Sequence, residues 1–588
     1  MADNSNLQKA NKAKQDEFYT QLSDSKAEIQ LGVLFLFFIL LILSSGVLYG
    51  FVSLWDIVPG SCFILLFHIL SLQKSQYKFL YNSLYTAFFS IIIFFTATIF
   101  IFYKLNSRTF EIEDFYLICD SSFPEIQEFI SDRKQILPVA GGLASTLIFI
   151  SAYYCSGKMG KKKFSKKLYF QNKKIYILTG LLNILCLFIW CMKSNIIGIA
   201  YPRQVCRIYL AGVYNAELAK RDFLEGRLHA KNYLKKGICS KEKSDLPVTC
   251  ILIIGESATA HAMNCYGHPV KNTPFLSRKQ KINSIKGDFI LLKNCFALDN
   301  LTTAVLPQIL SNSDYTNPLS IKNSILIFDI CNFLNINSFI ITNQAAAGTS
   351  ISNLTEGAQH TVYAFEKRLK NTGLLDRTTP PDEVVLPYFT QILSHLNQDQ
   401  NNLIILHLFG SHFPYKNRLP ANYIPSFGRD KYSKTEFYYF QTIEYTDRLL
   451  QEICKTTEKK LIQPYVICYV SDHGEDPTGK TGRGQRNIQD NIPAFFAVPC
   501  IFFLSEKYSS LYPDKMKFLK ENRNKIFLNE HIFDTLLGIF NISVNDSFLS
   551  HETKNIFSKK YEQNLNGVKI LNYQFPLETM IKNNSSIP

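Results

Sequence analysis

The 588-residue sequence has no regular cysteine spacing, no internal repeat, no low-complexity tract and no basic patch interleaved with aromatic residues. The last of these absences argues against nucleic-acid binding, although the formal net charge is +15. The cysteines after residue 195 are irregularly spaced, so no disulfide pairing can be deduced from them. Cys250 and Cys468 lie inside apolar runs and are expected to be buried thiols.

Apolar residues make up 47% of the chain, which is too many for a purely soluble protein with 19% charged residues. Almost all of this excess lies in the first ~195 residues, so we expect a membrane part followed by a globular part. Five segments are long enough, or nearly so, to span ~30 Å of hydrocarbon. No small-residue cleavage site follows the first, so we expect it to remain as an anchor. The five segments are Leu31–Val52, Val58–Leu72, Phe79–Tyr103, Ile136–Tyr154 and Ile175–Trp190.

Charge in the connecting loops predicts how these spans are oriented. Residues 158–174, between the fourth and fifth spans, contain eight lysines and no acidic residue, whereas the 104–135 loop has more acids than bases. Because lysine-rich loops stay in the cytoplasm, the amino terminus is predicted to be cytoplasmic. With five spans, everything after residue ~195 then lies outside the inner membrane.

The composition along the chain suggests four parts: a cytoplasmic segment (1–30), five transmembrane helices (31–193), interfacial linker helices (194–245) and a globular domain (246–588). From Leu246 short apolar runs alternate with polar helical stretches, as in an α/β domain with a mostly parallel sheet. Two amphipathic helices are expected near Pro381–Leu396 and Lys434–Lys455. The expected strands are Val248–Ile254, Ser338–Thr342, Leu403–Leu408, Tyr465–Val470 and Ala497–Phe503.

Three of these strands end in residues that can bind metal or phosphate. Glu256 follows the first, His412 follows the third within Gly-Ser-His, and Asp472 with His473 follows the fourth. Ligands of open α/β sheets bind beyond the carboxyl ends of the strands, and carboxylate oxygen with imidazole nitrogen suits zinc or manganese. Taken singly, each residue is explained as well by a turn or a cap. His407, inside an apolar run, is expected to be a core histidine.

Two threonines, Thr302 and Thr303, stand just inside a helix-like start that continues to Pro307. The unpaired N–H groups of a helix start favour a phosphate or an alkoxide, although plain N-capping by threonine is the commoner role. Together with the strand ends, the pattern describes a metal centre with a hydroxyl nucleophile. A metal such as zinc would lower the pKa of the hydroxyl and neutralise charge during phosphoryl transfer.

At these residues the chain resembles the phosphoethanolamine transferases of the alkaline phosphatase and sulfatase superfamily. The matching pieces follow the family's order over nearly the whole chain. They are the five spans, Ile253-Ile-Gly-Glu-Ser257, Tyr266-Gly, Asn272-Thr-Pro274, the threonine segment ending at Pro307, Thr342-Asn-Gln344, Pro380–Leu393, Leu406-His-Leu-Phe-Gly-Ser-His412, Ile443-Glu-Tyr-Thr-Asp447 and Ser471-Asp-His-Gly-Glu475.

The resemblance implies a role for each site residue. Glu256, Asp472 and His473 would bind zinc, and Thr302 would contact the zinc and bear the phosphoethanolamine, while His412 and Asn343 would lie at the phosphate. It also implies a bacterial inner-membrane protein with a periplasmic catalytic domain. Such enzymes take phosphoethanolamine from phosphatidylethanolamine and pass it to lipid A, a core sugar or a similar envelope acceptor.

The sequence departs from the family pattern at two places. Many relatives carry another histidine a dozen or so residues after Asp-His, but Thr478–Gln489 has none, which leaves a second zinc open; Arg483 or Arg486 could bind phosphate instead. A disulfide that brackets the nucleophile in some relatives is also missing. A phosphoglycerol transferase, a phosphodiesterase or sulfatase-type hydrolase, and an inactive membrane-anchored scaffold therefore stay as alternatives.

Overall fold

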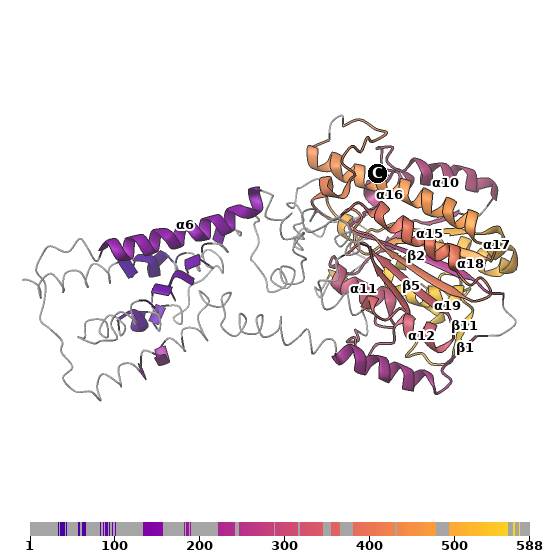
Figure 1. The fold of residues 1–588 in the computed structure, drawn as a ribbon, viewed down its shortest axis with the longest axis horizontal. Helices are drawn as coiled ribbons and strands as arrows, with labels where there is room; N and C mark the ends of the chain where they lie inside the picture. The colour runs from indigo at the N-terminus through magenta and orange to yellow at the C-terminus, as the bar shows by residue number, and fades with distance from the viewer. Residues whose placement is uncertain are drawn as a thin grey trace, which may run out of the picture. The chain divides into compact units, whose positions relative to one another are not determined.

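The computed structural model describes 133–156, 221–241, 246–286, 289–314, 318–344, 354–364, 380–429, 432–477, 493–562, 569–570 and 575–576, with scattered residues in 33–101 and 181–189 (Figure 1). The chain divides into two compact units. The N-terminal unit is formed largely by residues before 215, and the C-terminal unit largely by Asn215–Pro588.

The N-terminal unit contains one helix that is described along its length, α6 (Arg133–Ser156), at the position of the fourth predicted span. Its Phe149 is buried against Phe37 and Phe89, with ring centroids 5.0 and 6.1 Å apart. Within the described part of the chain, we find no helix with both the length and the apolarity to cross a membrane. The other four predicted spans lie mostly outside the described residues, so the five-span arrangement stays a prediction.

A seven-stranded sheet forms the centre of the C-terminal unit. The four ladders that run from β8 through β2, β7 and β5 to the edge strand β6 are parallel, whereas β9 runs antiparallel to both of its neighbours. The predicted mostly parallel sheet is therefore confirmed. In spatial order the strands are β3 (Phe289–Leu292), β9 (Cys500–Leu504), β8 (Tyr465–Ser471), β2 (Thr249–Gly255), β7 (Asn402–His407), β5 (Asn337–Thr342) and β6 (His360–Tyr363).

Helices cover both faces of this sheet and give three layers, α/β/α (Figure 1). The first face packs against α10 (Pro274–Lys286), α15 (Val385–His395) and α16 (Lys434–Lys460). The second packs against the described helix 221–234 and against α11 (Thr302–Leu310), α12 (Ile327–Phe333), α17 (Glu506–Leu511), α18 (Pro513–Asn522) and α19 (Ile532–Ile539).

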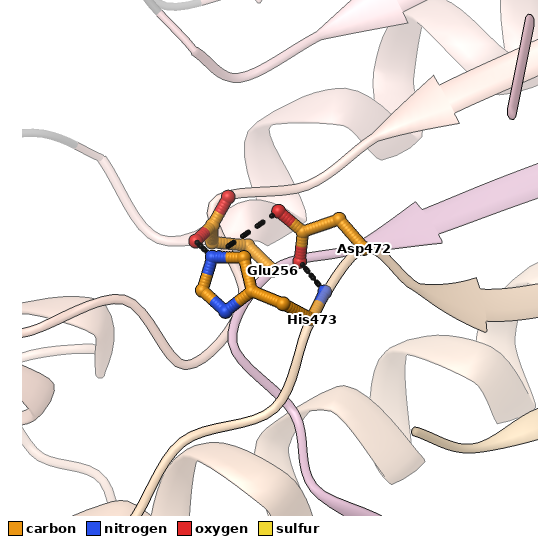
Figure 2. Close-up of side chains that lie close together, drawn as sticks. All are labelled: Glu256, Asp472 and His473. Carbon is orange, nitrogen blue, oxygen red and sulfur yellow. Dashed lines mark hydrogen bonds and ion pairs between the residues drawn. The ribbon is translucent and has the colours of Figure 1, made fainter. Parts of the chain in front are cut away.

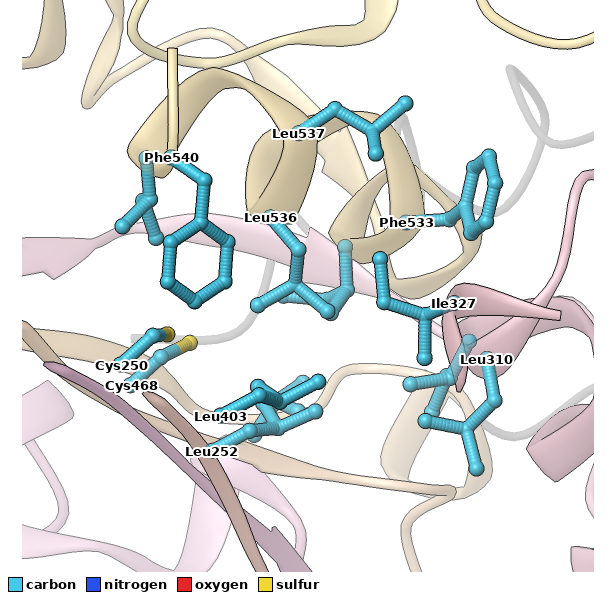
Figure 3. Packing of buried hydrophobic residues seen from close by; sticks show 14 of the residues in the cluster. Cys250, Leu252, Leu310, Ile327, Leu403, Cys468, Phe533, Leu536, Leu537 and Phe540 are labelled. Carbon is cyan, nitrogen blue, oxygen red and sulfur yellow. The ribbon is translucent and has the colours of Figure 1, made fainter. Parts of the chain in front are cut away.

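Side chains of β2 show why both layers are needed. Successive strand residues point to opposite faces, so Cys250 and Leu252 join the core under α19 while Ile251 and Ile253 join the core under α16. A strand buried on both faces reads as an unbroken apolar run. Figure 3 shows the first of these cores, where Phe533, Leu536, Leu537 and Phe540 lie over Cys250, Leu252, Leu403 and Cys468.

The remaining strands form small pairs outside the main sheet: β1 (Cys239–Lys241) with β11 (Ile542–Val544), β4 (Asn294–Phe296) with β10 (Ile526–Leu528), and β12 (Lys569–Ile570) with β13 (Phe575–Pro576). Short 3-10 segments connect the layers: η1 (Ala260–Ala262), η2 (Asn264–Tyr266), η3 (Asp382–Val384), η4 (Tyr415–Arg418), η6 (Pro493–Phe495), η7 (Asn529–His531) and η8 (Glu552–Lys554).

All five predicted strands exist, with ends displaced by at most three residues, and both predicted helices exist at α15 and α16. The thiol prediction is also confirmed, because Cys250 and Cys468 are free and fully buried. The other described cysteines of the C-terminal unit are likewise free and buried, namely Cys239, Cys265, Cys295, Cys331, Cys454 and Cys500.

Candidate metal centre and nucleophile

Neighbouring strands bring the predicted ligands together. In the parallel ladder of β2 and β8, Gly255 is paired with Ser471, so the residues that follow them, Glu256 and Asp472, leave the sheet side by side. Asp472 N–H donates to the Gly255 carbonyl at 3.1 Å, which extends this register past the strand ends. Adjacent parallel strands thus convert two distant segments of sequence into one site.

Glu256, Asp472 and His473 form a group whose ligand atoms all lie within 4.8 Å of one another, and all three residues are buried (Figure 2). His473 Nε2 lies 3.3 Å from Glu256 Oε1 and 3.5 Å from Asp472 Oδ2. The other ring nitrogen, Nδ1, lies 2.8 Å from the Gly474 carbonyl, to which it can only donate. With Nδ1–H donated to this carbonyl, Nε2 of neutral His473 presents its lone pair to the site, as a metal ligand does, whereas Nε2–H of protonated His473 donates to Glu256.

Thr302 completes the group from a different element. It is the first residue of α11, and its Oγ1 lies 2.8 Å from Glu256 Oε2 and 2.7 Å from Asp472 Oδ2. The N-cap position belongs to Leu301, and α11 has no side-chain cap. Thr302 therefore does not cap α11. Its hydroxyl contacts the Glu256 and Asp472 carboxylates instead.

The pKa values of Glu256 and Asp472 are shifted in opposite directions. Burial opposes ionisation of Glu256, but the hydrogen bond and charge of His473 outweigh it and hold the pKa of Glu256 well below its usual range. Burial and, next, the negative charge of Glu256 raise the pKa of Asp472 to about 7. Without a cation, Asp472 thus retains a proton near neutral pH, as expected when two carboxylates share one buried site.

The donor set fits a divalent metal ion. Two carboxylate oxygens, one imidazole nitrogen and one hydroxyl oxygen converge on the same small volume, and the single hydroxyl proton of Thr302 can satisfy only one carboxylate at a time. Oxygen and nitrogen donors in a group of four suit zinc, and a cation would balance the negative charge that burial makes costly.

Backbone geometry aims Glu256 and Asp472 at each other. Ser257, directly after Glu256, has φ of 56°, a left-handed conformation that is rare outside glycine and is often found at functional sites. In this turn, Ser257 Oγ donates to Glu256 Oε1 at 2.7 Å and Ser257 N–H donates to Asp472 Oδ1 at 3.1 Å. Asn529 Nδ2 donates to the Asp472 carbonyl at 2.6 Å from η7.

Gly410 lies against the other side of Glu256. Its φ is 51°, and a Cβ on this residue would meet the Glu256 carbonyl oxygen at 2.7 Å and the Glu256 nitrogen at 2.8 Å. Only glycine allows the loop after β7 to approach the Glu256–Ser257 turn so closely, because any side chain would push Glu256 out of position.

We expect Gly410→Ala to weaken divalent-metal binding by about 10- to 100-fold, as displacement of a metal-supporting residue does. Isothermal titration with zinc on the purified chain measures this affinity. Gly267→Ala is the matched control: that glycine also has positive φ, 106°, but a Cβ there meets nothing within 4 Å. Equal loss of metal affinity in both variants would mean that backbone strain, rather than contact with Glu256, is responsible.

His412 lies at the edge of the site after β7, partly exposed. Its ring packs edge-on against Phe409, with centroids 5.0 Å apart, and its Nδ1 lies 2.6 Å from the Phe413 carbonyl. That contact fixes the ring's orientation. The charge of His412 also lowers the pKa of Glu256, after the larger effects of burial and His473, so the histidine lies near the carboxylates.

Asn343 contacts the segment before α15. Its Nδ2 donates to the Pro380 carbonyl at 2.9 Å and to Asp382 Oδ1 at 2.8 Å, and its role at the phosphate stays a prediction. The neighbouring Gln344 makes the site contact instead, because its Nε2 donates to Glu256 Oε2 at 3.2 Å. The correct segment was identified from the sequence, but the side chain that faces the carboxylates is one position further along.

Asp382 supports the loop that carries His412, and sequence reasoning missed it. This buried carboxylate accepts the N–H groups of Phe409 and Gly410 at 2.8 Å each, as well as the Asn343 amide. Nothing in the local sequence marks it, because Asp382 precedes α15 and resembles an ordinary acidic helix start.

His407 is a core histidine, as expected. It is fully buried, burial lowers its pKa to about 4, and its Nδ1 lies 3.5 Å from Thr342 Oγ1. Arg483 and Arg486, which are the candidate replacements for the missing histidine, lie outside the described residues. The part they play at the phosphate therefore stays a prediction.

Comparison with known proteins agrees with this geometry. Among curated relatives, phosphoethanolamine transferase EptA of Helicobacter pylori is 27% identical over 53% of this chain and 57% of its own length. Phosphoethanolamine transferase EptC of Escherichia coli is 25% identical over 51% of this chain and 52% of its own. The chain thus spans about half the length of these relatives, and the resemblance predicted from the motifs is confirmed.

A solved structure extends the comparison to the fold of nearly the whole chain. The integral membrane protein lipooligosaccharide phosphoethanolamine transferase A of Neisseria meningitidis superposes with a TM-score of 0.55 and 16% identity, over 91% of this chain and 98% of that one. The sequence profile of the sulfatase family matches residues 249–542, half of the chain, which include β2, α11 and β8 and hence every member of the metal group. The chain therefore belongs to the sulfatase family.

Proposed function

We propose that this protein is a zinc-dependent phosphoethanolamine transferase that acts through Thr302. The observation that carries the proposal is the position of the Thr302 hydroxyl, 2.8 Å from Glu256 and 2.7 Å from Asp472, at the first turn of α11. A threonine needs nearby groups that activate its hydroxyl before it can be a nucleophile, and a metal held by those carboxylates is one such group. The names of the curated relatives support phosphoethanolamine as the group transferred.

In this proposal Glu256, Asp472, His473 and the Thr302 oxygen hold one zinc ion. When bound, zinc would supply Lewis-acid chemistry that lowers the pKa of the threonine hydroxyl. Thr302 Oγ1 loses its proton and forms a bond to the phosphorus of phosphatidylethanolamine while the bond from phosphorus to the glycerol oxygen breaks. Diacylglycerol leaves after its oxygen takes up a proton, and phosphoethanolamine remains on Thr302 as an ester.

The second half of the reaction reverses the first with a different alcohol. A hydroxyl of lipid A, a core sugar or a similar envelope acceptor attacks the phosphorus and loses its proton, and the Thr302 oxygen leaves and regains one. In this proposal His412 binds a phosphoryl oxygen in both halves, and the unpaired N–H groups at the start of α11 stabilise the same negative charge.

We further propose that the N-terminal unit contains five transmembrane helices in the bacterial inner membrane and that the C-terminal unit lies in the periplasm. The lysine-rich 158–174 loop and the acidic 104–135 loop support this orientation. A membrane anchor suits a lipid donor, because tethering keeps the site at the bilayer surface where phosphatidylethanolamine is available.

Incubation of the purified chain with phosphatidylethanolamine labelled in its headgroup tests the proposal. We expect release of diacylglycerol and transfer of the label to Thr302, detected by peptide mass spectrometry. Diacylglycerol release with free phosphoethanolamine, without need of an acceptor alcohol, would indicate a hydrolase. Labelled phosphatidylglycerol as the better donor would indicate a phosphoglycerol transferase, and no turnover of either lipid would favour a scaffold.

A further inference from the structure

The described helix 221–234 is attached firmly to the C-terminal unit (magenta, beside α12 in Figure 1). Arg227 forms an ion pair with Asp329 at the start of α12, and its Nη2 donates to the carbonyls of Ile321 and Ser324 at 3.0 and 3.1 Å. A Cβ on Gly226 would lie 2.7 Å from the Ile321 carbonyl oxygen, so the helix backbone rests directly on this loop. The helix therefore moves with the catalytic site as one body.

The opposite side of this helix carries two leucines among cations. Leu224 is 58% exposed and Leu228 is 61% exposed. Residues separated by three and four positions share one side of a helix, so the exposed Arg221 and Lys231 lie on the same side as the two leucines. The exposed Lys235 directly follows the helix, and its N–H donates to the Lys231 carbonyl at 3.2 Å, which continues the helical path to this residue. We call these five residues the outer face.

The outer face stays positively charged when its two acidic neighbours are included. The Glu225 carboxylate lies 2.5 Å from Lys322 Nζ and 3.6 Å from Arg221 Nε, and Asp222 Oδ1 lies 3.8 Å from the same Lys322 Nζ. The four cations Arg221, Lys231, Lys235 and Lys322 thus outnumber the two carboxylates, which leaves a net charge of +2 at this surface.

We propose that the outer face binds the surface of a bilayer containing anionic phospholipid. Exposed leucines between lysine and arginine side chains suit this surface, because the leucines enter the acyl region while the cations meet phosphate groups. Two leucines offer far too little apolar area for a specific protein interface, which needs about 1,000 Å². The inference rests on the membrane anchor in the proposed function, and not on the identity of the transferred group.

Even weak binding of the outer face to lipid is sufficient when the chain is already tethered to the same bilayer. The helix begins only 31 positions after Trp190, where the fifth predicted span ends, so the bilayer is present at high effective concentration. Since Arg227 and Gly226 fix the helix to the unit, binding of the outer face would set the orientation of the whole catalytic unit relative to the lipid. The surface is thus a positioning device for a site that must take its donor from the membrane.

Photocrosslinking of the full chain in lipid nanodiscs tests this inference. p-Benzoylphenylalanine is placed at position 228, with position 224 as a second site, and at the exposed Glu458 on α16 as the matched control. With phosphatidylcholine and phosphatidylglycerol together, we expect lipid adducts at 228 and 224 by mass spectrometry and few at 458. Equal adducts at all three positions, no adducts, or crosslinks from 228 to a second copy of the chain would each overturn the proposal.

The charge requirement is tested with Lys231→Gln/Lys235→Gln in the same discs. Each cation near an anionic surface contributes a factor of about five to binding, so the double variant should lose most of its lipid adducts at 228. Discs of phosphatidylcholine alone should give the same loss in the unaltered chain. Adduct yields that do not depend on either change would contradict the anionic-lipid assignment. Because crosslinking needs no turnover, failure of the proposed transferase activity would not be confused with failure of this inference.

Discussion

Thr302→Ala should lower phosphoethanolamine transfer by about a thousandfold or more, as removal of a covalent nucleophile does. The same variant should carry no phosphoethanolamine after incubation with the donor, because the oxygen that forms the ester is gone. Its thermal stability should change little, since the Thr302 side chain is partly exposed and the metal keeps Glu256, Asp472 and His473 as ligands. Diacylglycerol release and intact-protein mass spectrometry measure these effects.

Thr303→Ala is the matched control. Thr303 stands in the same first turn of α11 and has the same intermediate exposure, but the contacts to Glu256 and Asp472 come from Thr302. We expect Thr303→Ala to retain most of the activity. The opposite result, with an inactive Thr303 variant and an active Thr302 variant, would move the nucleophile by one residue and contradict the geometry.

Removal of zinc by a chelator should abolish activity and lower the melting temperature by about 3 °C. A ligand present at a hundred times its dissociation constant stabilises the folded state by about 2.7 kcal/mol, and for a unit as large as this one each kcal/mol corresponds to about 1 °C. The lower melting temperature has a direct cause in the site, because the buried carboxyl groups of Glu256 and Asp472 then lie side by side without a cation between them. Differential scanning calorimetry and elemental analysis check the two halves of this result.

Glu256→Gln/Asp472→Asn separates the metal from other effects of the chelator. This variant removes the negative charge that attracts the ion, so its melting temperature should not respond to added zinc or to chelation. The metal-free variant should be at least as stable as the metal-free unaltered chain, because the repulsion between the carboxylates is gone. A zinc-dependent melting temperature in the variant would place the stabilising ion elsewhere in the chain.

The candidate metal ligands could be brought together from the sequence because they follow strands whose apolar runs are long. Once β2 and β8 are recognised, the carboxyl edge of a parallel sheet brings Glu256 and Asp472 together whatever the loops between them do. Thr302 was harder, since the start of a helix suggests capping as readily as catalysis. Its assignment depended on the family resemblance and is now supported by its contacts.

Other features of the site depend on tertiary contacts that no local pattern encodes. Asp382 binds the backbone of residues far along the chain, and Gly410 is needed only because Glu256 lies beside it. Asn343 and Gln344 show the limit most plainly, because adjacent amides point to different partners once the turn is formed. The antiparallel direction of β9 was equally hidden, since an apolar run predicts burial but not strand direction.

The buried thiols of the C-terminal unit affect the kinetic stability of the protein. All of the cysteines described in this unit are free and sealed from solvent, so oxidants reach them only when the unit opens. In the oxidising compartment proposed for this unit, each opening exposes thiols that can pair wrongly before the chain closes again. Its working lifetime is then governed by the rate of unfolding rather than by the equilibrium between folded and unfolded chains, which makes it a kinetically protected protein.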